Sequence, residues 1–334
     1  MTVLAFIEHD RGRLVPAALE SLTFGRQLAN SLSTQLEAIT IGSEADKLAA
    51  QLGEFGATTV HQAHHELLGD FSPDGWADSI VTLIRTENFD AVVAAGSDRG
   101  NEVLAQVAAR LDAPFVANVL PIEIDLITVD PDAPWQLTRV RWGGSLHERT
   151  ELPADVKLLT VALHGVEPQR ASTPSSARAQ TFTPVLEPRA SITVVRDRVE
   201  REAGVTLATA SVVVGGGRGV GSAEGFAPLE DLAQLLGGVV GCSRAVTNNG
   251  WRNHTDQVGQ TGTRIGAEVY FACGISGAIQ HWVGASGAKC IIAINTDEGA
   301  NIVTKADYAV IGDLHEVVPA IADEIRRRNA EHAR

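Results

Sequence analysis

Short apolar runs alternate with longer amphipathic segments through the first third of the chain. The apolar runs have the length of buried strands, and the segments between them repeat apolar residues at helical spacing. Strands at 3–7, 36–41, 58–61 and 90–95 and helices at 16–30, 43–52, 76–86 and 99–111 are predicted. Strands that alternate with helices form parallel sheets, so we expect a doubly wound, mostly parallel α/β domain.

The alternation ends near residue 119. Apolar runs at 119–124, 135–141 and 157–163 follow one another without long helices, which predicts antiparallel strands added to the sheet edge. Prolines then recur through 167–189 among small polar residues, and no hydrophobic period is present there. This composition favours an extended linker between domains. We therefore expect a first domain at 1–185 that ends in a proline-rich linker.

A second α/β pattern occupies the rest of the chain. Its apolar run Cys290–Ile294 is typical of a central strand in a parallel sheet. Strands are predicted at 210–214, 239–241, 268–272, 290–294 and 308–311, and helices at 228–236, 276–283 and 314–328. We expect a Rossmann-like α/β domain at 200–334.

Charge and cysteine content narrow the range of functions. The chain of 334 residues has a net charge of −14, and such a surface repels nucleic-acid phosphates, so nucleic-acid binding is not expected. The same charge suits either solubility or docking onto a basic patch of a protein partner. The three cysteines fit no zinc or disulfide pattern, which favours a reducing compartment. Because membrane-length apolar runs and signal-peptide features are lacking, we expect a cytoplasmic protein that is not membrane-embedded.

Candidate chemistry gathers in the loops that follow the strands of the second domain. The first strand runs into the glycine-rich stretch 215–221, which contains Arg218. Glycine lets backbone N–H groups approach a phosphate closely, and the arginine can bind the same anion. A plain tight turn is the alternative. Ser243 and Arg244 follow the next strand, at the edge where open α/β sheets bind ligands. A capping serine beside a surface arginine would have the same sequence.

Two further loops extend this pattern. The loop 257–262, Gln-Val-Gly-Gln-Thr-Gly, offers amide and hydroxyl groups to a heteroaromatic ring, or forms an ordinary polar turn. In Gly274–His281 a helix is expected to begin at Ser276, where free N–H groups would bind a pyrophosphate. His281 lies one turn into that helix, and either reaches the same ligand or is a structural histidine.

The last two strands are followed by Asn295 and Asp313, which either hold a ribose hydroxyl or cap a helix. Five glycine-bearing loops at strand ends of one domain together predict an elongated crevice for a dinucleotide. No Ser-His-Asp order, carboxylate pair or metal cluster in the sequence competes with it, so we expect no catalytic residue and no metal site. The other histidines, including His61, His64 and His65, are expected at the surface.

The same loops resemble the larger (alpha) subunit of electron-transfer flavoproteins. The resemblance covers about 205–330 strongly, and the first domain weakly through the opening strand that ends in Glu8-His9. The matching stretches are Ser211–Gly219 (Ser-Val-Val-Val-Gly-Gly-Gly-Arg-Gly), Ser243-Arg244, Gln257–Gly262, Gly274–His281 (Gly-Ile-Ser-Gly-Ala-Ile-Gln-His), Ala293–Asn295, Ala306–Tyr308 and Gly312–Leu314.

This resemblance implies that the second domain binds FAD. Arg244 would lie against the isoalloxazine ring, where a fixed positive charge favours an anionic reduced flavin. Thr261 would hydrogen-bond the reactive edge of the ring, and His281 its carbonyl side. The helix start near Ser276 would lie at the pyrophosphate. Asn295, Asp313 and Leu314 would hold the adenosine half. The implied FAD-binding residues are Arg218, Ser243, Arg244, Gln257, Val258, Gly259, Gln260, Thr261, Ser276, Gly277, Ala278, Ile279, Gln280, His281, Asn295, Asp313 and Leu314.

The resemblance also implies partners. It implies a heterodimer with a smaller beta subunit, for which the first domain would serve as a partner-binding scaffold. Electrons would come from flavin dehydrogenases, such as those that act on acyl-CoA in fatty acid β-oxidation, and leave to a quinone oxidoreductase or another acceptor. The chain would be an electron carrier without substrate turnover of its own. The alternatives are a subunit of an NADH-dependent electron-bifurcating complex, an NAD-dependent enzyme and a non-redox nucleotide-binding regulator.

Two segments depart from the pattern of that family. Many members carry an Asp and a Pro between the Ser-Arg pair and the Gln-Val-Gly loop, and the stretch Val246–His254 has neither. Gly143-Gly144-Ser145 stands where members commonly have Gly-Asn. These departures concern the redox potential and the choice of partner more than FAD binding.

Overall fold

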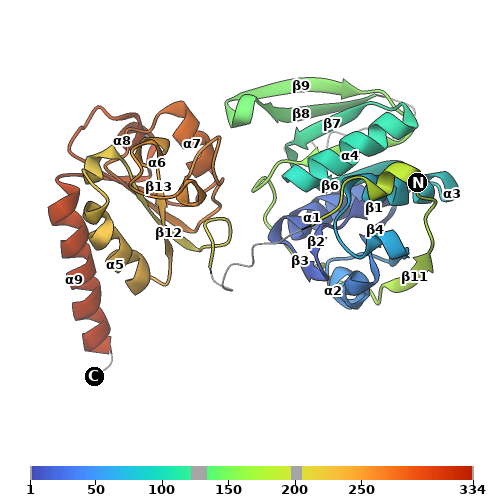
Figure 1. The fold of residues 1–334 in the computed structure, drawn as a ribbon, viewed down its shortest axis with the longest axis horizontal. Coiled ribbons are helices and arrows are strands. Elements are labelled where there is room, and N and C mark those ends of the chain that lie inside the picture. Colours follow the sequence, from blue (N-terminus) through green and yellow to red (C-terminus); the bar gives the residue numbers. More distant parts are fainter. Residues whose placement is uncertain (1, 122–133, 197–204, 333–334) are drawn as a thin grey trace. The chain divides into compact units, whose positions relative to one another are not determined.

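The computed structural model describes residues 2–121, 134–196 and 205–332. Two compact units make up the chain, the first from residues 1–199 apart from 143–145, and the second from the remainder. Each is a sheet flanked by helices (Figure 1), which confirms the expected two-domain α/β fold. No helix in the described ranges is long and apolar enough to cross a membrane.

Nine strands form the main sheet of the first unit, in the order β11-β5-β4-β1-β6-β10-β7-β8-β9. The pairs from β11 to β7 are all parallel. The strands are β1 (Thr2–Phe6), β4 (Gln35–Ile41), β5 (Thr59–Ala63), β6 (Ala91–Ala95), β7 (Phe115–Val119), β8 (Trp135–Arg141), β9 (Leu146–Leu152), β10 (Lys157–Val161) and β11 (Arg178–Phe182), with a separate hairpin of β2 (His9–Asp10) and β3 (Arg13–Leu14). The α-helices are α1 (Pro16–Ser31), α2 (Ala49–Glu54), α3 (Pro73–Thr86) and α4 (Asp98–Leu111).

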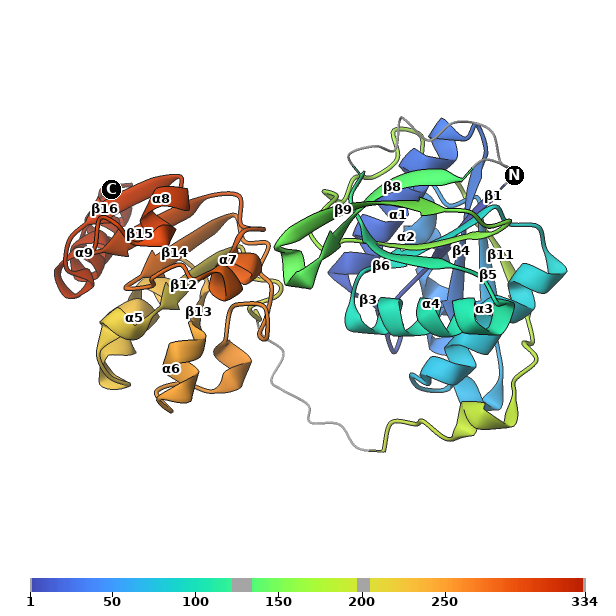
Figure 2. The same ribbon diagram turned by 90° about the horizontal axis from the view of Figure 1, so that it is seen from above.

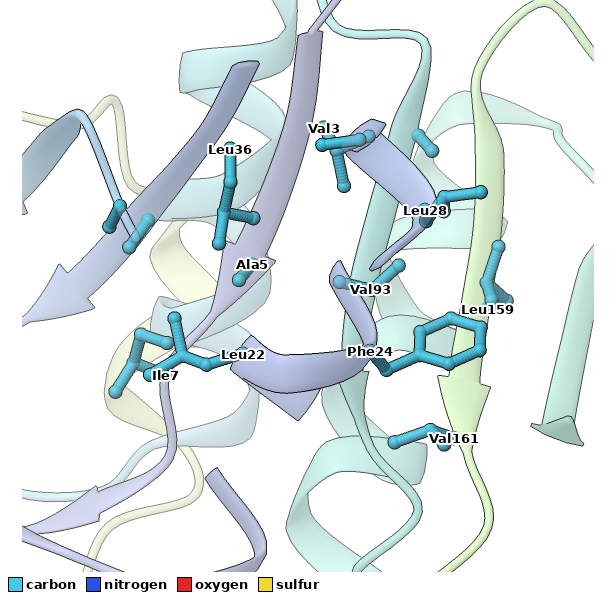
Figure 3. Packing of buried hydrophobic residues seen from close by; sticks show 14 of the residues in the cluster. Val3, Ala5, Ile7, Leu22, Phe24, Leu28, Leu36, Val93, Leu159 and Val161 are labelled. Atoms are coloured by element: carbon cyan, nitrogen blue, oxygen red, sulfur yellow. The ribbon is translucent and has the colours of Figure 1, made fainter. Parts of the chain in front are cut away.

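Helices cover both faces of this sheet. On one face Val3 and Ala5 of β1 pack with Leu22, Phe24 and Leu28 of α1, all of them buried (Figure 3). On the other face α3 and α4 share a second apolar cluster, and they lie side by side in Figure 2. Burying a Leu or Phe side chain stabilises a fold by about 1.5–3 kcal/mol. The two-sided core therefore makes the first unit doubly wound, as the alternating pattern predicts.

One segment expected at the antiparallel edge lies inside the sheet. β10 pairs in parallel with β6 and β7, so the antiparallel prediction for 157–163 is wrong. All five residues of β10 are buried, which fits its apolar run and a central place in the sheet. β8 and β9 are antiparallel, as expected of the edge. Of the run predicted at 119–124, Val119 ends β7, and residues 122–124 lie outside the described ranges.

The proline-rich stretch 167–189 is not a free linker. β11 pairs in parallel with β5 at the sheet edge. Before β11 the backbone N–H of Ser175 donates to the Gly53 carbonyl (3.0 Å), and after it the N–H of Glu187 donates to Asp78 Oδ2 (2.9 Å). The stretch is therefore attached to the first unit along most of its length. Its residues are mostly exposed, so no apolar alternation signalled the strand.

His61 is also placed differently from expectation. It lies on β5 with 3 % of its surface exposed, and its Nε2 is 2.5 Å from Glu37 Oε2 on the neighbouring strand. The expected surface position is therefore wrong for His61. His64 and His65 are partly exposed.

The second unit has a five-stranded, wholly parallel sheet in the order β13-β12-β14-β15-β16. Helices α5 and α9 pack on one face, and α7 and α8 contribute to the core on the other. The strands are β12 (Val212–Gly216), β13 (Val239–Cys242), β14 (Val269–Cys273), β15 (Ile291–Asn295) and β16 (Tyr308–Ile311). The helices are α5 (Ala227–Leu235), α6 (Arg244–Asn248), α7 (Ile279–Ala285), α8 (Asn301–Lys305) and α9 (Leu314–His332). The chain runs from β12 to β13 on one side and then to β14 on the other, so the topological switch point lies between β12 and β14.

Candidate functional site

A cleft of about 780 Å³ opens at the carboxyl end of the second sheet. Its walls come from the loops that follow all five strands, around the switch point where open α/β sheets bind ligands. A cleft of this volume accommodates a large cofactor. The lining residues that the sequence predicted are Arg218, Ser243, Arg244, Ser276, Ala278, Gln280, His281, Asn295, Asp313 and Leu314.

Other predicted residues lie outside this lining. They are Gln257, Val258, Gly259, Gln260, Thr261, Gly277 and Ile279. The cleft also includes residues absent from the predicted set, among them Thr296, Asp297 and His315. These three directly follow predicted residues at the ends of β15 and β16, so their position after the strands was the available signal.

Two guanidinium groups give the cleft a positive character. Arg218 and Arg244 are both exposed at its wall. Within the described ranges, neither guanidinium has a hydrogen bond or ion pair with the protein. In a chain with a net charge of −14, two unpaired arginines at one cleft favour an anionic ligand.

His281 contributes a buried polar group to the same wall. It is 7 % exposed, and its Nε2 lies 2.8 Å from the Oη of Tyr270. Its Nδ1 is buried and has no hydrogen-bond partner among the described residues. Burial lowers the pKa of His281 to about 4, against an opposing effect of the Val258 carbonyl. The ring is therefore neutral at pH 7.

The loop 257–263 is organised by a buried amide. Gln257 is 3 % exposed, and its Oε1 accepts a hydrogen bond from Thr247 Oγ1 (2.9 Å). Its Nε2 donates to Thr261 Oγ1 (2.9 Å), so the hydroxyl proton of Thr261 is left to be donated elsewhere. The backbone N–H of Gln260 donates to the Gln280 carbonyl (2.7 Å), which ties the loop to the cleft wall. Thr261 itself is exposed.

The unusual stretch before this loop is anchored by charge. Arg252 pairs with Glu230 Oε1 (2.6 Å) and Asp256 Oδ2 (3.0 Å), and its guanidinium lies over the ring of Phe226. Thr247, in the same stretch, bonds to Gln257. The departures from the family pattern in this stretch are thus accommodated by a local ion-pair network next to the loop.

The sequence suggested that the glycines at 215–217 make room for a ligand, but in the structure they make room for other parts of the protein. An ideal Cβ at Gly215 would overlap the hydroxyl of Tyr270, and one at Gly216 would overlap the ring of Phe226. At Gly217 a Cβ would overlap the Gly274 carbonyl. These three glycines admit neighbouring parts of the protein, so close approach to a ligand does not explain them.

The helix expected to begin at Ser276 begins later. α7 starts at Ile279, and Gly277 has a φ of +75°, which is not helical. An ideal Cβ at Gly277 would also overlap the backbone of Ile302, so the chain makes a tight turn there before the helix starts. Ser276 is therefore not in the first turn of a helix, and the prediction of a pyrophosphate site formed by such a turn is wrong. Ser276 and Ala278 still line the cleft, as part of a loop.

Asn295 and Asp313 both have structural partners. Asn295 donates from Nδ2 to the Ile275 carbonyl (2.8 Å) and accepts the Asp297 N–H at Oδ1 (3.0 Å). Asp313 accepts the N–H of His315 at Oδ1 (2.9 Å), in the first turn of α9. Both interpretations left open by the sequence are compatible with these contacts, because each side chain stabilises a loop and also lines the cleft.

The parallel sheet, the switch-point cleft and its unpaired arginines define a dinucleotide-binding α/β protein. Residues 206–286 match the family model described as the electron transfer flavoprotein FAD-binding domain, and residues 3–186 match the one described as the electron transfer flavoprotein domain. The chain belongs to the electron-transfer flavoprotein alpha-subunit family, and its cofactor is FAD.

Relatives match along nearly their whole length. Electron transfer flavoprotein subunit alpha of Thermoanaerobacterium thermosaccharolyticum is 32 % identical over 96 % of this chain and 97 % of its own. The subunit alpha of Bacillus subtilis is 32 % identical over 98 % of both chains. A protein of Anaerotignum propionicum named acryloyl-CoA reductase electron transfer subunit beta is 31 % identical over 97 % of this chain and 95 % of its own.

The groups in the cleft fit FAD. The guanidiniums of Arg218 and Arg244 suit its pyrophosphate and electron-rich ring, and His281 lines the same cleft. Amide and hydroxyl groups of the loop 257–263 add neutral hydrogen-bonding capacity beside them.

Proposed function

We propose that this chain is the FAD-holding subunit of a cytoplasmic electron carrier. It pairs with a beta subunit, accepts electrons from flavin dehydrogenases such as those of fatty acid β-oxidation, and passes them to a quinone oxidoreductase or another acceptor. The observation that carries the proposal is the cleft in which Arg218 and Arg244 have no partner within the described ranges. Full-length similarity to alpha subunits of electron transfer flavoproteins supports the assembly with a beta subunit.

Different residues of the cleft would hold different parts of FAD. Arg218 and the loop with Ser276 would bind the pyrophosphate, while Asn295 and Asp313 would bind the adenosine half. Arg244 would lie against the isoalloxazine ring. FAD supplies the electron chemistry, because its ring takes up and releases electrons one at a time or in pairs. The protein supplies position and charge.

Arg244 sets the electrostatic environment of the ring. A guanidinium within a few ångströms stabilises negative charge by about 1–4 kcal/mol, depending on solvent exposure. Thr261 lies in the loop 257–263 outside the cleft lining, and its remaining hydroxyl proton would add a neutral hydrogen bond where the ring meets that loop. Beside bound FAD the fixed positive charge of Arg244 would favour added negative charge on the ring, which is the property that a one-electron carrier needs.

Redox titration of Arg244→Ala tests the proposal. We expect the first-electron potential of bound FAD to fall by roughly 60 mV for each 1.4 kcal/mol of lost stabilisation. Arg218→Ala is the matched control, because it removes an arginine from the same cleft and should weaken FAD binding with little change in potential. An unchanged potential in Arg244→Ala would contradict the assigned role, and a colourless complex of the wild-type chain with its beta subunit would contradict the function.

A bifurcating complex is the second candidate. A relative of similar length that is named acryloyl-CoA reductase electron transfer subunit beta supports this candidate. In that circuit NADH would reduce the FAD directly, whereas a simple carrier would be reduced by an acyl-CoA dehydrogenase with its substrate. Mixing the purified complex with each donor and recording the flavin absorbance separates the two circuits. A nucleotide-binding regulator would be reduced by neither.

A further inference from the structure

The side chain of Arg252 joins two elements of the second unit that are distant in sequence. It is 21 % exposed, and it donates from Nε to Asp256 Oδ2 (3.0 Å) and from Nη1 to Glu230 Oε1 (2.6 Å). Its Cζ also lies 5.1 Å from the centre of the Phe226 ring. A planar guanidinium can bind two carboxylates and lie on an aromatic face at the same time. Arg252 therefore connects α5, which carries Glu230, to the short turn that ends at Asp256.

Asp256 is followed directly by the loop 257–263. Gln257, the first residue of this loop, is 3 % exposed, so its backbone is fixed in the interior. Further along the loop, the N–H of Gln260 donates to the carbonyl of Gln280, a residue that lines the cleft. A short chain of contacts thus runs from α5 through the ion pairs to the wall of the cleft.

Phe226, the ring beneath the guanidinium, packs against the strand that leads to the glycine-rich stretch. It is 1 % exposed, and an ideal Cβ at Gly216 would lie 2.3 Å from its Cε1. Gly216 ends β12, and Arg218 lines the cleft two residues later. Arg252 is therefore in contact with residues that support two of the loops beside the cleft.

The stretch that Arg252 belongs to has little rigidity of its own. Val246–His254 contains no proline to restrict its backbone, and it includes Asn248-Asn249-Gly250. Gly250 has a φ of +71°, and an added Cβ there would meet no atom within 4 Å. Such a stretch has many accessible conformations unless side chains restrain it. The ion pairs of Arg252 supply that restraint immediately before the loop 257–263.

We propose that Arg252 is a positioning residue that holds the loop 257–263 against the wall of the cleft and so keeps it ordered for bound FAD. Arg252 acts through Asp256 and does not line the cleft itself. The proposal rests on the FAD-binding function, in which this loop would meet the isoalloxazine ring. Because the restraint is partly exposed and ionic, it should weaken at high salt.

Hydrogen exchange tests the restraint without the cofactor. We would measure amide exchange by NMR in the full chain with its beta subunit, before FAD is added. Arg252→Met retains an unbranched stem over Phe226 and removes the charge. We expect the Gln260 amide to exchange about 3- to 10-fold faster in this variant, and the strand amides of Val214 and Ala272 to be unchanged. An unchanged Gln260 amide, or equal acceleration of all three amides, would overturn the proposal.

FAD affinity provides a second readout. The dissociation constant of FAD should rise by about 3- to 10-fold in Arg252→Met. If Arg252 acts through Asp256, the double variant Arg252→Met/Asp256→Asn should bind no worse than Arg252→Met alone. Additive losses would overturn the proposal. Arg326→Met is the matched control, because Arg326 of α9 pairs with Asp231, the neighbour of Glu230 on α5, and should leave both readouts unchanged.

Salt and a conservative variant distinguish an ionic restraint from simple packing. The difference in FAD affinity between the wild type and Arg252→Met should shrink in about 1 M salt, where charges are screened beyond about 3 Å. Arg252→Lys keeps the charge but cannot bind both carboxylates in the same planar geometry, so it should give intermediate values in both readouts. A difference that does not change with salt would overturn the proposal.

These experiments separate the two hypotheses. If the wild-type complex binds no FAD, the proposed function fails, while exchange of the Gln260 amide still tests the restraint by Arg252. If FAD binds equally well to the wild type and Arg252→Met, the proposed function stands and the positioning role is overturned. If Arg252→Met does not fold, Arg252→Lys and the effect of salt on the Gln260 amide of the wild type decide.

Discussion

At position 215 any side chain would meet the ring of Tyr270. The overlap involves the hydroxyl first, followed by ring atoms at 2.6 and 2.7 Å. Both residues lie in the core of a parallel sheet, and Tyr270 is among the largest fully buried side chains. A tightly packed interior cannot absorb an extra methyl group without shifting one of its neighbours.

Gly215→Ala should therefore destabilise the second unit by about 1–3 kcal/mol, measured by urea unfolding. Tyr270→Phe in the same chain should recover part of the loss, because it removes the nearest of the overlapping atoms. Gly299→Ala is the control, since its Cβ would meet only Asp297 Oδ1 at 3.4 Å. Equal stability of Gly215→Ala and the wild type would show that the strands separate more easily than this packing implies.

The sequence identified the wall of the cleft better than the layer behind it. Arg218, Ser243, Arg244 and His281 could be found because they follow strands, and parallel strands end at one edge. Tyr270 could not be found, because a tyrosine inside an apolar strand looks like any other core residue. Its hydrogen bond with His281 becomes visible only when the fold brings the two residues together.

Among the elements, α1 carries a buried carboxylate into the core of the first unit. Glu20 is 6 % exposed, and its Oε2 accepts the backbone N–H of His164 (2.7 Å), in the loop after β10. Burial raises the pKa of Glu20 to about 7, although the hydrogen bond from His164 acts in the opposite direction. Between pH 4.5 and 7 the folded chain thus holds a proton that the unfolded chain has lost. This group makes folding less favourable as the pH rises through that window.

Glu20→Gln should remove this pH dependence. The variant should match the wild type near pH 5 and exceed it at pH 8 by up to roughly 3 kcal/mol, because the ionised carboxylate is no longer buried. Urea unfolding at both pH values checks this. Glu54→Gln, at an exposed carboxylate of the same unit, should behave alike at both. A Glu20→Gln variant that is less stable at pH 8 would mean that the carboxylate is stabilising when charged.

Element prediction succeeded where burial follows a simple period. The strands β1, β4 and β6 and the helices α1, α3 and α4 were recognised from apolar spacing. β11 was missed because an exposed edge strand has no buried face to give it a pattern. The direction of β10 was predicted wrongly, because strand direction depends on partners distant in sequence. The start of α7 was placed too early, since the contact between Gly277 and Ile302 is also distant.

At the scale of the whole molecule, the predicted FAD-binding residues are confined to one of the two units. Every predicted FAD residue and every lining residue of the cleft belongs to the second unit. A ligand that binds the folded state stabilises it by about 2.7 kcal/mol at a concentration 100 times its Kd. That stabilisation should be concentrated where the ligand is held.

Hydrogen exchange should therefore separate the units when FAD is added to the complex with the beta subunit. We expect slower exchange in the loops after β12, β13, β14, β15 and β16, and unchanged exchange in the strands β1, β4 and β6. Mass spectrometry of peptides from both units provides the measurement. Strong protection confined to the first unit would contradict the prediction that the second unit binds FAD.

The packing of Gly215 against Tyr270 has a consequence for how this family can vary. The two positions are far apart in sequence, yet position 215 cannot gain a side chain while Tyr270 keeps its full size. Among relatives, a larger residue at the position of Gly215 should occur together with a smaller one at that of Tyr270. Such a chain would also lose the hydroxyl that holds His281, so the histidine should become free to diverge as well. The three positions would then be inherited as a set.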